Sequence, residues 1–292
     1  MANISESPYT ISYPEIIAVA PEDGTEVELI ERFDCTGGAM WVGHHYIKSP
    51  LVRSARVVGS TQRFMLKPGC VDLKLEGSYF PAGISAVELN DSEIGISYLG
   101  MGGGGVGASV CRASAKGVLR AETDPSGGGK IAGTRLWLPR MERVIIGIDD
   151  TDTSEEGATW TLAHNISKAV EDEHSRYLSH TIVQLFPVPY RTKNCVALAC
   201  EFATDRPEQL IDSFQKLVEK YTLSDETGLA VFRGFDPSPL EEYGKSVKAG
   251  EVTMADLEKI RKYLDIRIEG RGIIGASAAI PYYTRYEEAL SI

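Results

Sequence analysis

The chain has 292 residues, of which 43% are hydrophobic and 24% are charged, as is typical of a globular protein long enough for two domains. Its net charge of −11 falls mostly after residue 140 and argues against a dedicated nucleic-acid-binding protein, so we do not expect nucleic acid as a partner. There is no signal sequence, no apolar run near the roughly 20 residues of a membrane helix, and no C-x-x-C cysteine pair; we therefore expect a cytoplasmic protein without a membrane partner, a disulfide framework or a zinc ribbon.

The first part of the chain, residues 1–140, is predicted to form a β-rich domain. Short β-prone runs are separated by turn signals at residues 9–17, 27–32, 63–66, 71–75, 85–89 and 93–98. A short helix is expected at 108–115. Residues 101–140 hold six bases and two acids, so a local basic groove stays open there.

A glycine-rich run at residues 100–107 lies between the last of these strands and the short helix. Backbone N–H groups of such a loop can approach a phosphate closely, which makes Gly102, Gly103, Gly104 and Gly105 candidate nucleotide-binding residues. The run is not a Walker A loop, because no Gly-Lys-Ser/Thr follows. A flexible surface loop is the alternative.

Cys35, His44 and His45 hint at a thiol or metal site in the same domain. If His44 and His45 lie on a strand, their side chains point to opposite faces and cannot share a metal ion. A structural role for these residues is therefore the expectation.

The second part, residues 141–292, is predicted to be a ferredoxin-like domain. Strands are expected at 143–148, 181–186, 194–202 and 228–232, and helices at 159–173 and from Pro207 onward, where an apolar stripe repeats every 3.6 residues. The order β-α-β-β-α-β is the split βαβ arrangement. Thr253 begins a further helix, and residues 272–280 read as a strand or a tight turn. The fold class is therefore α+β.

An apolar strand runs directly into three carboxylates, Asp149, Asp150 and Asp152, with Thr151 between them. Carboxylates at a strand end suit Mg²⁺, which takes one or two of them together with waters and substrate phosphates. The alternative is an acidic loop that caps the next helix, for which one Asp would be enough. The pattern favours a magnesium and nucleotide site.

Two basic motifs follow. Arg191 and Lys193 lie in a strand-to-strand loop, and Arg271 lies between glycines in Gly270-Arg271-Gly272. Arginine and lysine can neutralise phosphate charge. The alternatives are a solvated hairpin tip for the first motif and close packing for the second.

The motifs at 146–152, 189–192 and 270–276 occur in order, and together they resemble the kinase-like, ferredoxin-like region of archaeal tRNA-isoleucine agmatinylcytidine synthetase over residues 143–285. The resemblance implies use of ATP and Mg²⁺ to phosphorylate a base carbonyl oxygen. It also implies that Thr159 contacts or receives phosphate, that Thr151 contacts phosphate, and that Asp150, Arg191 and Lys193 take part in catalysis.

The sequence departs from the synthetase in its 156–160 stretch and lacks the OB-fold and zinc ribbon that follow in that enzyme. The layout instead resembles methanogenesis marker protein 11. That resemblance implies a phosphoryl-transfer protein of methanogenesis-linked cofactor or enzyme maturation, with a small-molecule or protein substrate and an open question of homodimerisation. A non-catalytic nucleotide-binding assembly factor and an RNA-modifying enzyme are the alternatives.

Overall fold

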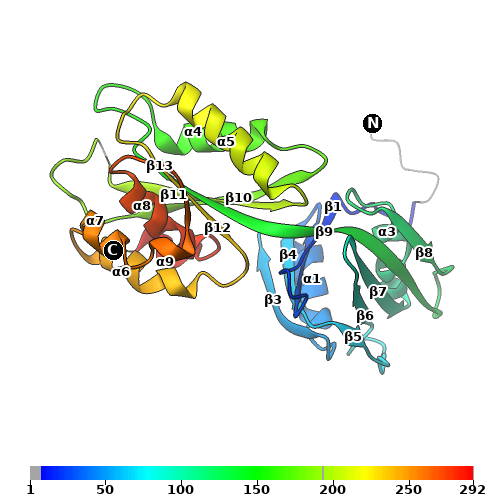
Figure 1. Ribbon diagram of the computed structural model, residues 1–292. Coiled ribbons are helices and arrows are strands. Elements are labelled where there is room, and N and C mark those ends of the chain that lie inside the picture. The colour runs from blue at the N-terminus through cyan, green and yellow to red at the C-terminus, as the bar shows by residue number, and fades with distance from the viewer. Residues whose placement is uncertain (1–7, 193, 292) are drawn as a thin grey trace. The chain divides into compact units, whose positions relative to one another are not determined.

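The computed structural model describes residues 8–192 and 194–291. The chain divides into two compact units, Met1–Met141 and Glu142–Ile292, which we call unit 1 and unit 2 (Figure 1). The long strand β9, Ile131–Asp149, supplies its first part to unit 1 and its last part to unit 2. Each unit is described by itself, and both mix helices with strands, which confirms the α+β class.

Unit 1 is built on a mostly antiparallel sheet in the order β3-β4-β2-β1-β9-β7-β6-β5, with β8 also paired to β9. The pairing of β1 with β9 is parallel. The bounds of its strands are β1 Glu15–Val19, β2 Val27–Arg32, β3 Val52–Val58, β4 Thr61–Leu66, β5 Gly69–Cys70, β6 Ala82–Leu89, β7 Glu93–Met101 and β8 Arg120–Thr123. Its helices are α1 Thr36–Tyr46, α2 Gly103–Ala108 and α3 Val110–Ala113.

Two expectations for unit 1 are wrong. The glycine-rich run is not a loop, because Gly103–Ala108 forms α2, against β7. The run that contains His44 and His45 is not a strand but α1, whose N-cap Cys35 accepts a hydrogen bond from the Gly38 N–H through its Sγ atom.

Unit 2 has the predicted β-α-β-β-α-β order. It runs from the end of β9 through α4 Thr159–Ala169, β10 Ser175–Gln184, β11 Val196–Thr204 and α5 Pro207–Tyr221 to β12 Gly228–Arg233. The strands lie in the order β10-β11-β9-β12-β13, all antiparallel, with β13 at Asp265–Glu269. The remaining elements are η1 Ser238–Leu240, α6 Glu241–Ala249, α7 Met254–Leu257, η2 Arg261–Tyr263, α8 Ile273–Ala279, η3 Ile280–Tyr282 and α9 Tyr286–Leu290.

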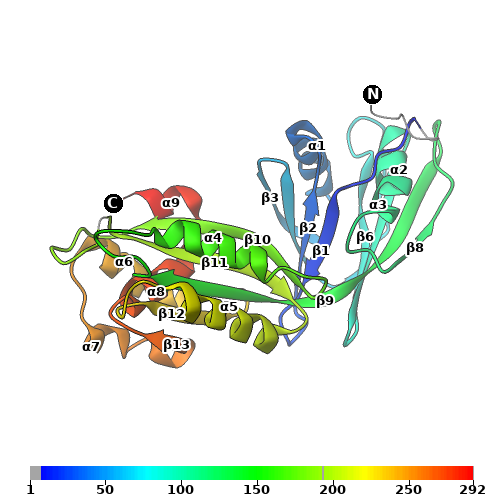
Figure 2. The same ribbon diagram turned by 90° about the horizontal axis from the view of Figure 1, so that it is seen from above.

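Helices cover both faces of the unit 2 sheet (Figures 1 and 2). Side chains alternate along a strand, so Val144, Ile146 and Ile148 of β9 face α4 and α5. Ile145 faces the opposite layer, which contains α6 and α8. The last part of β9 is therefore buried on both faces, in agreement with its continuous apolar sequence.

The expectation of a strand or tight turn at residues 272–280 is wrong, because this segment forms α8. Glycine brings α8 close to the sheet: a Cβ atom on Gly147 of β9 would lie 2.0 Å from the Ala276 carbonyl oxygen. A glycine- and alanine-rich helix is a poor helix former by propensity, and this close packing stabilises it.

A search of the helices in the described ranges finds none with the length and apolar character needed to cross a bilayer.

Candidate functional site

The candidate site begins where β9 ends, at Asp149 and Asp150. β9 pairs with β11 on one side and β12 on the other, so its end lies in the middle of the sheet. Asp150 has a φ of 52°, a left-handed conformation that is rare outside glycine, and it turns the chain out of the sheet. Its backbone N–H donates a 2.8 Å hydrogen bond to Oδ1 of Asp149.

The glycine motif of α8 fits against this carboxylate. A Cβ atom on Gly275 would lie 1.9 Å from Oδ2 of Asp149, and one on Gly272 would lie 2.8 Å from the Cβ atom of Asp150. No larger residue fits at Gly275 unless the carboxylate or the helix moves. The two glycines therefore let the start of α8 form one wall around Asp149 and Asp150.

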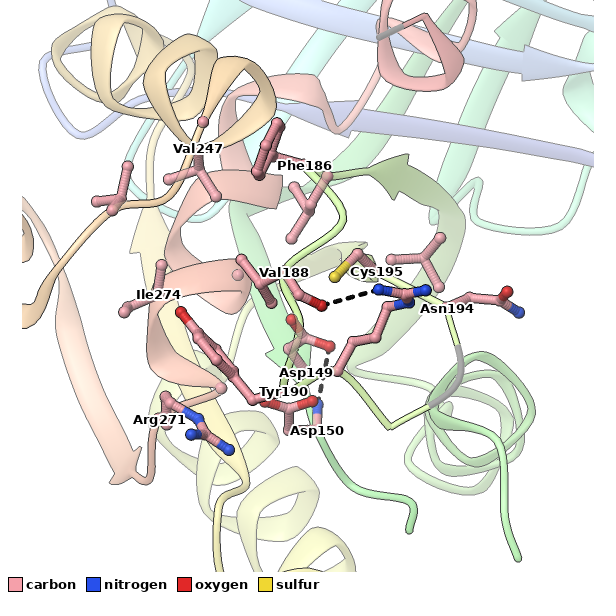
Figure 3. Close-up of a pocket in the computed structure, with 17 residues that line it drawn as sticks. Asp149, Asp150, Phe186, Val188, Tyr190, Asn194, Cys195, Val247, Arg271 and Ile274 are labelled. Carbon is pink, nitrogen blue, oxygen red and sulfur yellow. Dashed lines mark hydrogen bonds between the residues drawn. The ribbon is translucent and has the colours of Figure 1, made fainter. Parts of the chain in front are cut away.

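These residues line a pocket in unit 2 (Figure 3). Its polar side contains Asp149, Asp150, Tyr190, Arg191, Asn194 and Arg271, and its apolar side contains Leu185, Phe186, Val188, Val247, Val252 and Ile274. The free volume is about 70 Å³. That is room for several water molecules or one phosphate-sized group but not for a whole nucleotide. A nucleotide would therefore place only its phosphates inside.

Arg271 is held at the mouth of the pocket by its neighbours. Its guanidinium carbon lies 4.5 Å from the centre of the Tyr190 ring, and its backbone N–H donates to Oε2 of Glu226 at 3.0 Å. The Tyr190 hydroxyl donates to Glu251 at 3.0 Å. Arg191 instead donates from Nη1 to the Val188 carbonyl oxygen at 3.0 Å. Arg271 is thus the cation whose charge acts on the acidic pair.

The two carboxylates are unfavourably charged in each other's presence. Burial raises the pKa of Asp149 well above its usual range, and the negative charges of Asp150 and Asp152 raise it further. Burial also raises the pKa of Asp150, although the positive charge of Arg271 opposes that shift. A paired, partly buried set of carboxylate oxygens fits a divalent cation, which would relieve this repulsion.

Asp152, Thr151 and Thr159 lie behind the pocket, and none of them is among its lining residues. Oδ1 of Asp152 accepts hydrogen bonds from the hydroxyls of Thr159 at 3.4 Å and Thr192 at 3.3 Å. Oγ1 of Thr159 accepts from the backbone N–H of Thr151 at 3.2 Å. This network fixes the acidic loop to the start of α4.

The expected metal site with three carboxylates is therefore not formed. Among the residues that the structure describes, no group of three or more His, Cys, Asp or Glu side chains is placed to hold a metal ion. The reason is the hydrogen bonding of Asp152 to the two threonines, which leaves Asp149 and Asp150 as a pair. Thr159 is only 6% exposed, so phosphate has no open path to its hydroxyl.

The other predicted residues are distributed as follows. Arg191 and Arg271 line the pocket with the acidic pair, whereas Lys193 lies outside the described residues. Gly102, Gly103 and Gly104 line a separate pocket formed by unit 1 residues, and Gly105 is buried beside the Gly100 backbone. The structure therefore does not bring the glycine-rich run into the unit 2 pocket.

Sequence reasoning missed the apolar wall of the pocket and the role of Gly275. The wall comes from three separate stretches, at 185–188, 247–252 and Ile274. Each looks like ordinary core sequence in isolation. The spacing of glycines in 270–275 was the available signal, because glycine permits close backbone approach.

Comparison with known proteins assigns the site region to a family. Residues 145–269 match the model of the TiaS TCKD domain. The isoleucine-tRNA 2-agmatinylcytidine synthetase TiaS of Methanosarcina acetivorans is 29% identical over 150 residues, which cover 47% of this chain and 35% of the synthetase. The chain thus spans about a third of that relative's length. A solved structure of TiaS in complex with an isoleucine tRNA and ATP has 26% identity and a TM-score of 0.44, covering 48% of this chain and 36% of that one.

These findings overturn the expectation that nucleic acid is not a partner. The proteins that share this region are, by name, enzymes of a tRNA. Overall net charge was a poor guide, since a protein with a negative total can still bind RNA through a local surface.

A further relative matches nearly the whole chain. The protein MJ0921 of Methanocaldococcus jannaschii is 42% identical over 284 residues, which cover 93% of this chain and 94% of that protein. Unlike the synthetases, it therefore shares unit 1 as well as unit 2. The chain belongs to the same archaeal family as MJ0921, and its second unit contains a TiaS-like segment.

Proposed function

We propose that this protein is an ATP-dependent enzyme that modifies RNA and that the phosphates of ATP bind in the pocket of Asp149 and Asp150. The observation that carries the proposal is the acidic pair at the end of β9, within one pocket with Arg271. This pair lies in the segment that matches the TiaS domain. The resemblance of the three ordered motifs supplies ATP as the nucleotide.

The donor set of the pocket fits Mg²⁺. The carboxylates of Asp149 and Asp150 would hold the ion, and phosphate oxygens and waters would complete its coordination. When bound, Mg²⁺ neutralises charge on the phosphates of the nucleotide. The residues thus supply what phosphoryl transfer chiefly requires, which is positioning and neutralisation of negative charge.

The basic and hydroxyl side chains have separate roles in this proposal. Arg271, supported by the Tyr190 ring, would pair with a phosphate oxygen at the mouth of the pocket. Arg191 would stabilise charge on the transferred group from the opposite loop, where Lys193 also belongs by sequence. Thr159 is a positioning residue that holds Asp152 and Thr151 in place. Its phosphorylation, which the family resemblance implies, stays a prediction.

RNA is the proposed substrate because the relatives that share the segment are tRNA synthetases of a modified cytidine by name. The pocket is too small for a base and a nucleotide together. The base would therefore meet the phosphates at the mouth, beside Arg271 and Tyr190. Aromatic side chains such as Tyr190 are common stacking partners of unpaired RNA bases.

Isothermal titration calorimetry with ATP, in Mg²⁺ and in EDTA, tests the nucleotide part. We expect Mg²⁺-dependent binding that weakens by at least about tenfold in Asp150→Ala. Glu155→Ala is the matched control, because Glu155 is an exposed acid of the same loop. Equal affinity in wild type and Asp150→Ala would refute the assignment of the site.

Filter binding of a tRNA pool at low salt tests the RNA part, because electrostatic binding is strongest there. We expect retention of tRNA by the wild-type protein. ATP binding without any tRNA retention would refute RNA as the substrate while leaving the nucleotide site in place.

Membership in the methanogenesis marker protein 11 family, with its maturation role, stays a prediction. No feature of the pocket favours that role over RNA modification.

A further inference from the structure

Unit 1 contains a second and larger pocket, with a volume of about 670 Å³. Volumes of roughly 300–1,000 Å³ are typical of sites for small organic ligands. Its walls come from the loop after β2, from α1, and from the glycine-rich start of α2. The pocket lies wholly in unit 1, outside residues 145–269 that match the TiaS domain.

Four aromatic rings line this pocket: Tyr13, Phe33, Trp41 and Tyr46. Tyr13 and Phe33 pack together with ring centres 4.6 Å apart, and both are buried in the core of the unit. Trp41 belongs to the same lining and is 43% exposed. Burying an aromatic side chain is strongly favourable in water, so an exposed tryptophan in an aromatic pocket is a surface that a ligand would cover.

The one base among the described lining residues is already neutralised. Arg112 is fully buried and donates from Nε and Nη2 to the two carboxylate oxygens of Glu31, at 2.7 and 2.9 Å. Its third donor nitrogen, Nη1, reaches the Gly107 carbonyl oxygen at 2.5 Å. The guanidinium also lies 4.5–5.0 Å from three tyrosine ring centres. Arg112 therefore has no remaining capacity for an anionic ligand.

The acidic side chain in the lining, Asp34, adds to this selectivity. It is exposed at the pocket, where its carboxylate would repel a phosphate or a carboxylate. The glycines of α2 give the opposite wall a backbone surface without side chains, which suits the face of a flat molecule. Charge and shape thus agree on the class of ligand.

We propose that the pocket of unit 1 binds a planar, uncharged aromatic or heteroaromatic molecule, with its ring packed against Trp41. The site is independent of the ATP pocket and stands or falls without the proposed function. The glycine-rich run, which the sequence suggested as a phosphate loop, forms a wall of this site.

Titration of the full chain with Nile red, a neutral planar dye, tests the proposal by fluorescence. We expect saturable binding to one site and at least about tenfold weaker binding of the anionic dye 1-anilinonaphthalene-8-sulfonate. Trp41→Ala should weaken Nile red binding by about tenfold or more. Met40→Ala is the matched control, since Met40 is a 60% exposed apolar residue of the same helix outside the pocket.

A chemical measurement covers the case in which Trp41→Ala does not fold. Cys35 is an exposed lining residue, so bound dye should slow its alkylation by N-ethylmaleimide. The test uses a Cys70→Ser chain, because Cys70 is also exposed, and peptide mass analysis reads modification at Cys35. Unchanged alkylation at saturating Nile red, or equal binding of both dyes, would overturn the proposal.

Discussion

Asp149 and Gly275 are so close that a single added methyl group at Gly275 would lie 1.9 Å from the Oδ2 atom of Asp149. The glycine thus sets the position of the carboxylate on which the proposed metal site depends. We expect Gly275→Ala to displace Asp149 or α8 and to weaken Mg²⁺-dependent ATP binding by at least about tenfold, as measured by calorimetry.

The control for Gly275→Ala is Gly250→Ala. Gly250 lines the same pocket, but a Cβ atom there would meet nothing within 4 Å. If both variants lose ATP binding equally, the close contact between Gly275 and Asp149 is not the cause. A circular dichroism spectrum unchanged from wild type shows that the fold is retained.

Removing the charge of Asp149 should stabilise the metal-free protein. Its pKa is raised in the folded state, so the folded protein holds this proton more tightly than the unfolded chain does. Stability from this group is complete below the unfolded pKa of about 4 and is lost as the pH rises above it. In EDTA we therefore expect Asp149→Asn to have a higher Tm than wild type at pH 7, with about 2–4 °C for each kcal/mol gained.

The Tm difference between Asp149→Asn and wild type should shrink toward pH 4, where the wild-type carboxyl is neutral in both states. Adding Mg²⁺ at pH 7 should raise the Tm of wild type but not that of Asp149→Asn. A wild-type Tm above that of the variant in EDTA at pH 7 would show that the carboxylate is not destabilising.

Arg271 should act through the shape of its guanidinium as well as its charge. Its planar group lies over the Tyr190 ring and can bind phosphate with two nitrogens. We expect Arg271→Lys to weaken ATP binding by about tenfold and Arg271→Ala to weaken it further. Tyr190→Phe keeps the ring and should change affinity little. Wild-type affinity in Arg271→Lys would leave only a charge effect.

Thr159 should matter for the stability of the acidic loop. Thr159→Val removes the acceptor of the buried Thr151 N–H and the donor to Asp152. Leaving a buried donor unpaired costs about 1–3 kcal/mol, which thermal unfolding would show as a lower Tm. Thr161→Val is the control, because the Thr161 hydroxyl bonds only to the Ala158 carbonyl oxygen at the start of α4. Equal Tm values for the two variants would contradict the role of this network.

The strands and helices of unit 2 up to β12 were predictable because local pattern and tertiary packing agree. Val144, Ile146 and Ile148 alternate with residues of the opposite face, and α5 has a 3.6-residue apolar stripe. By contrast, α8 was not predictable, because its glycines and alanines favour a helix only in contact with β9. α1 was missed for a related reason: it begins with Gly37 and Gly38, and its cap is a cysteine rather than Ser, Thr, Asp or Asn.

The site was predictable in its charged residues and not in its geometry. Asp149, Asp150, Arg191 and Arg271 do meet in one pocket, as the motifs suggested. The pairing of Asp152 with two threonine hydroxyls depends on Thr192, 40 residues away along the chain. No local pattern could reveal that contact.

The most direct test of the central claim is ATP turnover by the purified protein in Mg²⁺, with and without a pool of unmodified tRNA transcripts. We predict that tRNA stimulates ATP consumption and that Asp150→Ala abolishes the stimulation while Glu155→Ala retains it. ATP consumption that is absent, or that is the same with and without tRNA, would contradict the account.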